Sequence, residues 1–331
     1  MLPEIQARQS HLEMPSLKKI THHYSSSGHR IKVPATGYLG VDVGSTSTKA
    51  VIINSSGRLL TKNYLMTAGK PVEAVKDVFR NLLGLGADKV KIAGVGVTGS
   101  GRYLIGSFIG ADLIKNEITA QTRAAAEIDA EADIIEIGGQ DSKLVIKKNG
   151  VVVDYQMNKA CAAGTGSFID ELAEMLGISV KNGDFAELAF KAPYTIDVGS
   201  KCTAFSAQAV ALAQQEGISL EVITASLASS IAKNYLSKVV GSRKLSNKVI
   251  LTGAVFYNQA IISAFHEQLE GKTLAVAEDR EVSGAIGAAI LVKEKVSGQG
   301  SSFKGFKEVI DSECVRSTFT CKACEDNCTI T

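Results

Sequence analysis

The sequence predicts an α/β protein made of two similar lobes, and two observations support this fold class. First, one pattern occurs twice: residues 41–52 read VDVGSTSTKAVI and residues 135–146 read IEIGGQDSKLVI. Each copy is an apolar run, a glycine-containing bend and a second apolar run, followed by a turn, which is the pattern of a β-hairpin. Second, the 331 residues are 45% hydrophobic, enough for two domains with a sizeable core.

The first 36 residues are polar and show no clean period, so we expect a tail or a linker there. We place the first lobe at residues 37–128. The spacing of its apolar residues, and the glycines between the apolar segments, predict the order of its elements. These are strands at 38–43, 50–54 and 59–67, a helix at 71–83, a strand at 90–97, and helices within 103–130.

The second lobe is predicted at residues 129–282 and begins with the strand 134–137 and its hairpin. The apolar periods that follow predict helices at 167–177, 203–216, 219–240 and 258–270, with short strands at 248–252 and 273–276. We expect residues 283–297 to form a last helix that returns to the first lobe. Residues 298–331 are predicted to be a cysteine-containing tail, truncated from a longer protein.

The charge balance excludes several classes of function. With a formal net charge of +2, nothing draws the chain to nucleic acid or to a membrane surface, so we expect neither partner. Apolar stretches such as 286–292 are too short to span a bilayer, and the first twenty residues lack a signal-peptide core. We therefore predict a cytoplasmic protein, whose six cysteines favour metal or redox chemistry over structural disulfides.

Two glycine bends that face each other expose backbone N–H groups, between which a polyphosphate fits. The paired hairpins, with the strand and small-residue turn LTGAV at 251–255, resemble the ATPase superfold of actin, hexokinase and the heat-shock chaperones. The resemblance implies two ribonuclease H-like lobes with a nucleotide cleft between them. It also implies that Asp42 orients Mg²⁺ through water, and that Gln140 or Asp141 orients the attacking water.

The resemblance assigns further residues to the nucleotide. The expected phosphate contacts are Gly44, Ser45, Thr46, Ser47, Lys49, Gly138 and Gly139. The expected seat for adenine and ribose is Gly253, Ala254, Gly284 and Gly287. Lys143 is equally well interpreted as a phosphate contact or as a solvated lysine at a strand end. Glu136 stands where many members of the superfold carry Asp, which leaves its metal role open.

Two cysteines stand just before predicted helices: Cys161 in NKACAAGTGSF and Cys202 in GSKCTAF. A helix N-terminus lowers the pKa of a thiol and stabilises an anionic ligand, so both positions suit an iron–sulfur cluster. A [4Fe–4S] cluster takes four thiolates. This lobe supplies two, so we expect a twofold dimer to supply the rest, with one cluster on its axis.

The motif CAAGTGSF after a GGQDSK loop resembles the activators of 2-hydroxyacyl-CoA dehydratases, a family that includes the ATP-binding subunits of benzoyl-CoA reductase. The resemblance covers about residues 37–295. It implies a homodimeric ATPase that binds ATP or ADP with Mg²⁺ and carries one bridging [4Fe–4S] cluster. Such an activator takes an electron from ferredoxin or flavodoxin and passes it, at very low potential, to a dehydratase or reductase partner.

Two other functions on the same superfold remain open: a small-molecule kinase of the sugar type, and a regulatory ATPase without a redox role. The kinase would have no use for cysteines at helix starts. The C-terminal cysteines Cys321, Cys324 and Cys328 form C-x2-C-x3-C, with Cys314 nearby. They suit a second cluster or zinc, or they are free thiols of a tail.

Overall fold

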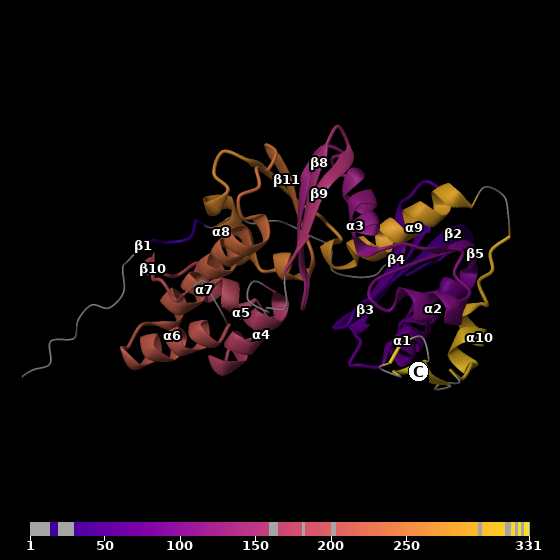
Figure 1. Cartoon of the computed structure of the whole chain (residues 1–331), viewed down its shortest axis with the longest axis horizontal. Helices are drawn as coiled ribbons and strands as arrows, with labels where there is room; N and C mark the ends of the chain where they lie inside the picture. The colour runs from indigo at the N-terminus through magenta and orange to yellow at the C-terminus, as the bar shows by residue number, and fades with distance from the viewer. Residues whose placement is uncertain are drawn as a thin grey trace, which may run out of the picture.

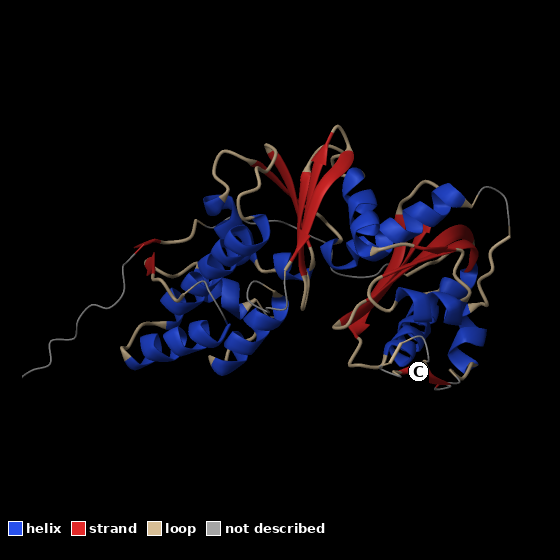
Figure 2. Cartoon of the chain, viewed as in Figure 1, coloured by secondary structure: helices blue, strands red, loops and turns tan. Residues whose placement is uncertain are grey.

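Helices pack on two five-stranded mixed sheets in this computed structural model (Figures 1 and 2). The structure describes residues 14–18, 30–158, 165–180, 183–199, 203–296, 300–314, 319–321, 324–325 and 328–330. Cys161 and Cys202, the two predicted cluster ligands, lie outside the described residues.

The first sheet has the strand order β4-β3-β2-β5-β6. Strands β2, β3 and β4 are antiparallel neighbours, whereas β5 and β6 run parallel to β2. The strands are β2 (Ala35–Val43), β3 (Ser47–Asn54), β4 (Leu59–Met66), β5 (Val90–Thr98) and β6 (Leu113–Ile114). The helices α1 (Pro71–Gly84), α2 (Arg102–Ile109) and α10 (Phe306–Asp311) gather on one face of this sheet (Figure 1).

The second sheet repeats this topology with the order β9-β8-β7-β11-β12. Its strands are β7 (Asp133–Ile137), β8 (Ser142–Lys148), β9 (Val151–Met157), β11 (Lys248–Thr252) and β12 (Thr273–Val276). Again three antiparallel strands are followed by two parallel ones. The duplicated hairpin predicted from the sequence is thus confirmed, as is the α/β fold class.

The helices of the second half pack into one apolar core with the second sheet. They are α4 (Gly166–Met175), α5 (Asp184–Ala189), α6 (Thr203–Gln215), α7 (Leu220–Tyr235) and α8 (Gln259–Gln268). The rings of Tyr235, Phe256 and Phe265 meet edge to face in this core. The predicted helix 219–240 is α-helical only to Tyr235 and continues as a π-helical turn over Leu236–Val240.

The predicted helical stretch 103–130 is interrupted. Helix α2 ends at Gly110, whose φ of 74° is left-handed, and the chain then forms β6 before α3 (Glu117–Ala126) begins. Helix α3 packs its apolar side, including Ala125, against Ile134 and Ile250 of the second sheet.

Helix α9 (Ser283–Lys295) packs so closely on the first sheet that the backbones of the helix and the strands are in contact. A Cβ atom on Gly40 would stand 1.9 Å from Ala285 O, and one on Gly96 would stand 2.2 Å from Ala288 O. Only glycine permits so close an approach. Helices α3 and α9 also contact each other, so the pair connects the two sheets and forms the floor between them (Figure 1).

Short strands also lie near both ends of the chain. Strand β1 (Met14–Pro15) pairs with β10 (Tyr194–Thr195), and the nearby Leu17 is buried in the second core. At the other end, β13 (Phe319–Thr320) and β14 (Thr329–Ile330) form a hairpin in which Cys321 N donates to Cys328 O at 2.8 Å.

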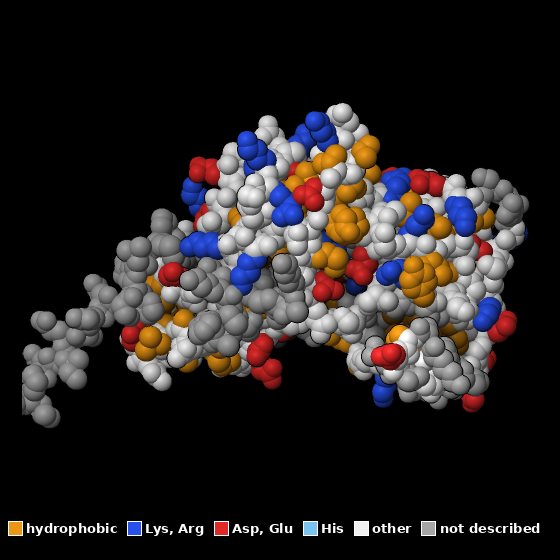
Figure 3. Space-filling model, in the orientation of Figure 1, with side chains coloured by type: hydrophobic (Ala, Val, Ile, Leu, Met, Phe, Trp, Pro, Cys, Tyr) orange, Lys and Arg blue, Asp and Glu red, His pale blue; other side chains and the backbone are white. Residues whose placement is uncertain are grey.

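No helix in the described parts of the chain has the length and apolar character that a membrane span requires. On the face drawn in Figure 3, basic and acidic side chains are interspersed over both lobes, in keeping with the small net charge.

Candidate functional site

The two glycine bends are closed by the same backbone hydrogen bond. We call residues 44–46, between β2 and β3, the first turn, and residues 138–141, between β7 and β8, the second turn. Gly44 N donates to Ser47 O at 2.9 Å, and Gly138 N donates to Asp141 O at 2.9 Å. The repeated sequence therefore produces a repeated backbone geometry.

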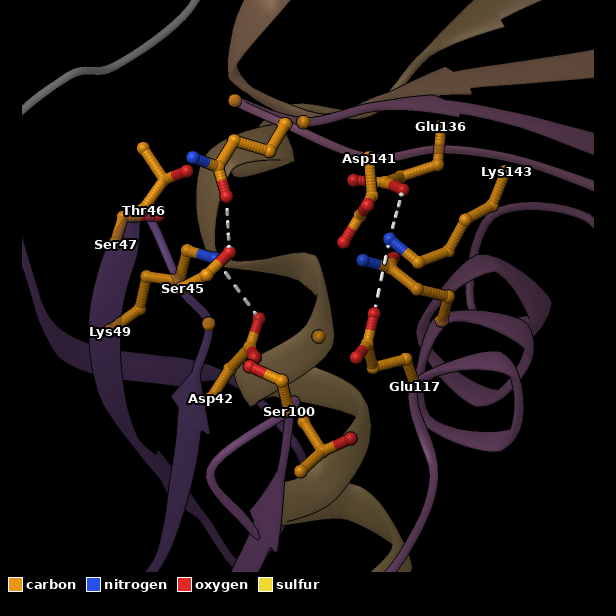
Figure 4. Close-up of a pocket in the computed structure, with 17 residues that line it drawn as sticks. Asp42, Ser45, Thr46, Ser47, Lys49, Ser100, Glu117, Glu136, Asp141 and Lys143 are labelled. Carbon is orange, nitrogen blue, oxygen red and sulfur yellow. Dashed lines mark hydrogen bonds and ion pairs between the residues drawn. The ribbon is translucent and has the colours of Figure 1, made fainter. Parts of the chain in front are cut away.

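The two turns face each other across a polar pocket (Figure 4). Including the part that is open to solvent, the space between them is about 520 Å³. The turns touch at the mouth: Ser45 Oγ donates to Gln140 Oε1 at 2.7 Å, and a Cβ atom on Gly139 would stand 2.8 Å from Thr46 Cγ2. The predicted residues that line the pocket are Asp42, Gly44, Ser45, Thr46, Ser47, Lys49, Gly138, Gly139, Gln140, Asp141, Lys143 and Gly284, together with Glu136.

Each hairpin places a lysine beside a carboxylate in this pocket. Lys49 Nζ lies 3.2 Å from Asp42 Oδ2. Burial alone would lower the pKa of Lys49, but the neighbouring Asp42 raises it above its usual value. Lys49 is therefore a fixed positive charge on the first-lobe side of the pocket.

The second lysine has two acidic partners. Lys143 Nζ lies 2.9 Å from Glu136 Oε2 and 3.1 Å from Glu117 Oε2. These two carboxylates raise the pKa of Lys143 although its burial opposes this. Lys143 is thus a buried, charged side chain, and the interpretation of it as a solvated lysine at a strand end is wrong.

Four lining residues were not predicted from the sequence: Thr98, Ser100, Glu117 and Gln121. Thr98 is the last residue of β5, and Ser100 lies two residues after it. The other two lie one turn apart on α3, whose N-cap Asn116 accepts from Thr119 N at 2.8 Å. An Asn-Glu-x-x-x-Gln segment could have signalled a helix start with two polar side chains on one face.

Buried polar atoms in the pocket suit a hydrated cation. Gln121 Oε1, Thr98 Oγ1 and Thr46 Oγ1 are buried, and none has a hydrogen-bond partner in the described portion of the chain. Together with the Asp42 carboxylate they offer oxygen atoms to the water shell that Mg²⁺ retains. The residues present therefore fit a magnesium ion held through water.

The four residues predicted to hold adenine and ribose lie in different places. Gly284 is at the pocket, since a Cβ atom there would stand 2.6 Å from Asp42 Oδ2. Gly287 faces α3, where a Cβ atom would stand 1.8 Å from Ala120 O, so it has a packing role. Gly253 N donates to Arg280 O at 3.0 Å, and Ala254 begins a 3₁₀ turn; neither residue lines the pocket.

The described residues contain no group of three or more His, Cys, Asp and Glu side chains arranged to hold a metal ion directly. Among the described residues, Cys314, Cys321, Cys324 and Cys328 form no disulfide bond.

A family model described as the BadF/BadG/BcrA/BcrD ATPase family matches residues 39–292 of the chain. An uncharacterised protein of Methanocaldococcus jannaschii, MJ0800, is 32% identical over 76% of this chain, which spans only 61% of that protein. The (R)-2-hydroxyglutaryl-CoA dehydratase activating ATPase of Acidaminococcus fermentans is 32% identical over 78% of this chain and 98% of its own length.

Among solved structures, the chain is similar to the activator of the 2-hydroxyisocaproyl-CoA dehydratase from Clostridium difficile with bound ADPNP. The TM-score is 0.71 at 27% identity, and the match covers 78% of this chain and 95% of that one. Residues 39–292, which the family model matches, include both glycine turns and the residues that line the pocket between them.

Proposed function

Because the chain belongs to the BadF/BadG/BcrA/BcrD ATPase family, and is an ATPase of that family, we propose that it activates a 2-hydroxyacyl-CoA dehydratase or a related reductase by ATP-driven electron transfer. The observation that supports this best is the pair of matching turns, each with a lysine–carboxylate pair, around one polar pocket.

In this proposal the phosphates of ATP lie between the two turns. The free N–H groups of the turns bind the phosphate oxygens, and Lys49 and Lys143 balance their charge. Asp42 holds Mg²⁺ through water, and the ion supplies further neutralisation of the phosphates when it is bound. Gln140 or Asp141 orients the water that attacks the γ-phosphorus as its bond to the bridging oxygen breaks.

The adenosine is assigned to the turn at Gly253 and Ala254. Both follow β11, which lies next to β7 in the second sheet, so this turn is on the same sheet edge as the second turn. Carboxyl ends of parallel strands at one sheet edge are a common location for nucleotides.

The electron-transfer part of the proposal depends on Cys161 and Cys202. The two thiolates from each of two copies would hold one [4Fe–4S] cluster, which supplies a one-electron site when bound. The electron would come from ferredoxin or flavodoxin and would leave to the dehydratase or reductase. A homodimer is required, since one chain provides only half of this ligand set.

The test is an assay of anaerobically purified full-length protein for iron, sulfide and ATP-dependent electron transfer. We expect about four iron atoms per dimer, as one [4Fe–4S] cluster requires. Reduction of an acceptor dehydratase should require both ATP and the cluster. Cys161→Ser should abolish iron binding and electron transfer, whereas Cys314→Ser, a matched control outside the proposed ligand set, should change neither.

An iron-free monomer would contradict the redox part of the proposal. If that monomer phosphorylated a sugar, the kinase alternative would replace it. If it hydrolysed ATP without an acceptor, the regulatory ATPase would replace it.

A further inference from the structure

The second turn is bonded to the start of α4. Gly166 N donates to Gly138 O at 2.8 Å, Ser167 N donates to Gly139 O at 2.8 Å, and Ser167 Oγ donates to the same Gly139 O at 2.7 Å. The first amides of a helix have no partner within the helix. Here two carbonyl groups of the second turn satisfy them, so the turn and the helix form one hydrogen-bonded unit.

The peptide units whose carbonyl groups accept from α4 direct their N–H groups away from α4. In a trans peptide the C=O of one residue and the N–H of the next point in opposite directions. The carbonyls of Gly138 and Gly139 are bound by α4, so the N–H groups of Gly139 and Gln140 point the other way. Both residues line the pocket, and neither N–H has a partner within the described ranges.

The packing leaves the second turn little freedom to move by itself. A Cβ atom on Gly166 would stand 3.2 Å from Gly138 O and 3.3 Å from the Cα of Gly139. On its other side, Gly139 is in contact with Thr46 of the first turn. A displacement of Gly139 relative to the first turn must therefore move α4 or break its bonds to α4.

We propose that Ser167 is a positioning residue that ties α4 to the second turn, so that the phosphate bound in the cleft sets the position of α4. A phosphate that accepts from the N–H of Gly139 and Gln140 polarises these peptide units and strengthens their carbonyl bonds to α4. The positive end of the α4 dipole faces the same carbonyls.

This inference rests on the proposed function and deepens it. Helix α4 begins five residues after Cys161 in the sequence. The second turn therefore connects the state of the nucleotide to the helix that follows a proposed cluster ligand. Nothing in the connection requires the cluster itself, so it can be tested on protein without iron.

The experiment is hydrogen–deuterium exchange of the full-length chain, without nucleotide and with Mg²⁺-ADPNP. In the wild type, ADPNP should slow exchange in the second turn and also in α4, each by about fivefold. This factor corresponds to the net free energy of one hydrogen bond. In Ser167→Ala the second turn should still respond, whereas the response of α4 should fall below about twofold.

Two further variants complete the test. Ser167→Thr keeps the hydroxyl group and should restore the response of α4. Ser312→Ala removes a hydroxyl that donates to Glu308 O in α10, and it should behave as the wild type.

The outcomes separate the two proposals. If ADPNP protects neither the second turn nor α4, the nucleotide function fails. If it protects the turn but not α4 in the wild type, the coupling is refuted while ATP binding stands. If Ser167→Ala keeps the full response of α4, the positioning role of Ser167 is refuted, because the two backbone bonds to the turn then suffice.

Discussion

Lys49 and Lys143 occupy equivalent positions in the two halves of the molecule, each directly opposite a carboxylate on the neighbouring antiparallel strand. The partner of Lys49 is Asp42, and that of Lys143 is Glu136. The equivalence is imperfect, because Lys143 also contacts Glu117 of α3. The second lysine is thus also tied to α3 on the floor of the cleft.

This difference predicts an effect of Lys143 on stability. Lys143→Met leaves Glu136 buried beside Glu117 without its ion-pair partner, so it should lower the free energy of unfolding by about 3 kcal/mol. The double variant Glu136→Leu/Lys143→Met removes the uncompensated charge and should recover most of this loss. Urea denaturation measures both. A double variant as unstable as the single one would show that the ion pair is not the cause.

A second ion-pair cluster connects the two lobes. Lys62 of β4 lies 2.7 Å from Asp279 and 2.8 Å from Glu281, which also accepts from the hydroxyl of Tyr257. The Lys62 side chain is only 5% exposed. Lys62→Met should therefore lower the free energy of unfolding by about 3 kcal/mol.

The matched control for Lys62 is Lys248→Met, which breaks a solvent-exposed pair of the same length with Asp129. Exposed pairs contribute little, so this variant should unfold like the wild type in the same urea titration. Equal effects of the two substitutions would contradict a buried connection between the lobes.

The sequence predicted the parts of the cleft that lie within a few residues of a hairpin turn, such as Asp42 and Gly138, because a hairpin is a local structure. It did not predict Glu117 or Gln121, which reach the cleft through the packing of α3 between the sheets. No local pattern specifies that packing. The packing of Gly287 against α3 could not be predicted for the same reason, because a glycine required by a neighbouring helix looks the same in sequence as one required by a ligand.

The contact at Gly287 gives a further prediction. Gly287→Ala would place a methyl group 1.8 Å from Ala120 O, so α9 and α3 must separate, at a cost of about 3 kcal/mol. Gly84→Ala, at the end of α1, meets no atom within 4 Å and should leave stability unchanged or slightly raised. Thermal unfolding of the two variants compares them. A tolerated Gly287→Ala would contradict the close packing of the two helices.

A pH dependence follows from Asp112, which anchors the segment before α10. Burial would raise the pKa of Asp112, but the hydrogen bonds from Ser301, Ser302 and Val95 N lower it below its usual value. A carboxyl with a lowered pKa stabilises the fold above its unfolded pKa of about 3.9, and this contribution is lost as the pH falls through the folded value.

Asp112→Asn should therefore lower the melting temperature at pH 7, and its difference from the wild type should shrink as the pH falls from about 5 to about 3. Scanning calorimetry across this range measures the difference. A difference that stays constant with pH would mean that the charge of Asp112 does not hold the segment.

The central claim, that ATP is hydrolysed between the two turns, is tested most directly by the ATPase rate of Asp42→Asn. The substitution keeps the shape of the side chain but removes the charge that would hold hydrated Mg²⁺. We predict that kcat falls at least about a hundredfold while ADPNP still binds. An ATPase rate equal to that of the wild type would place the chemistry elsewhere and contradict the account.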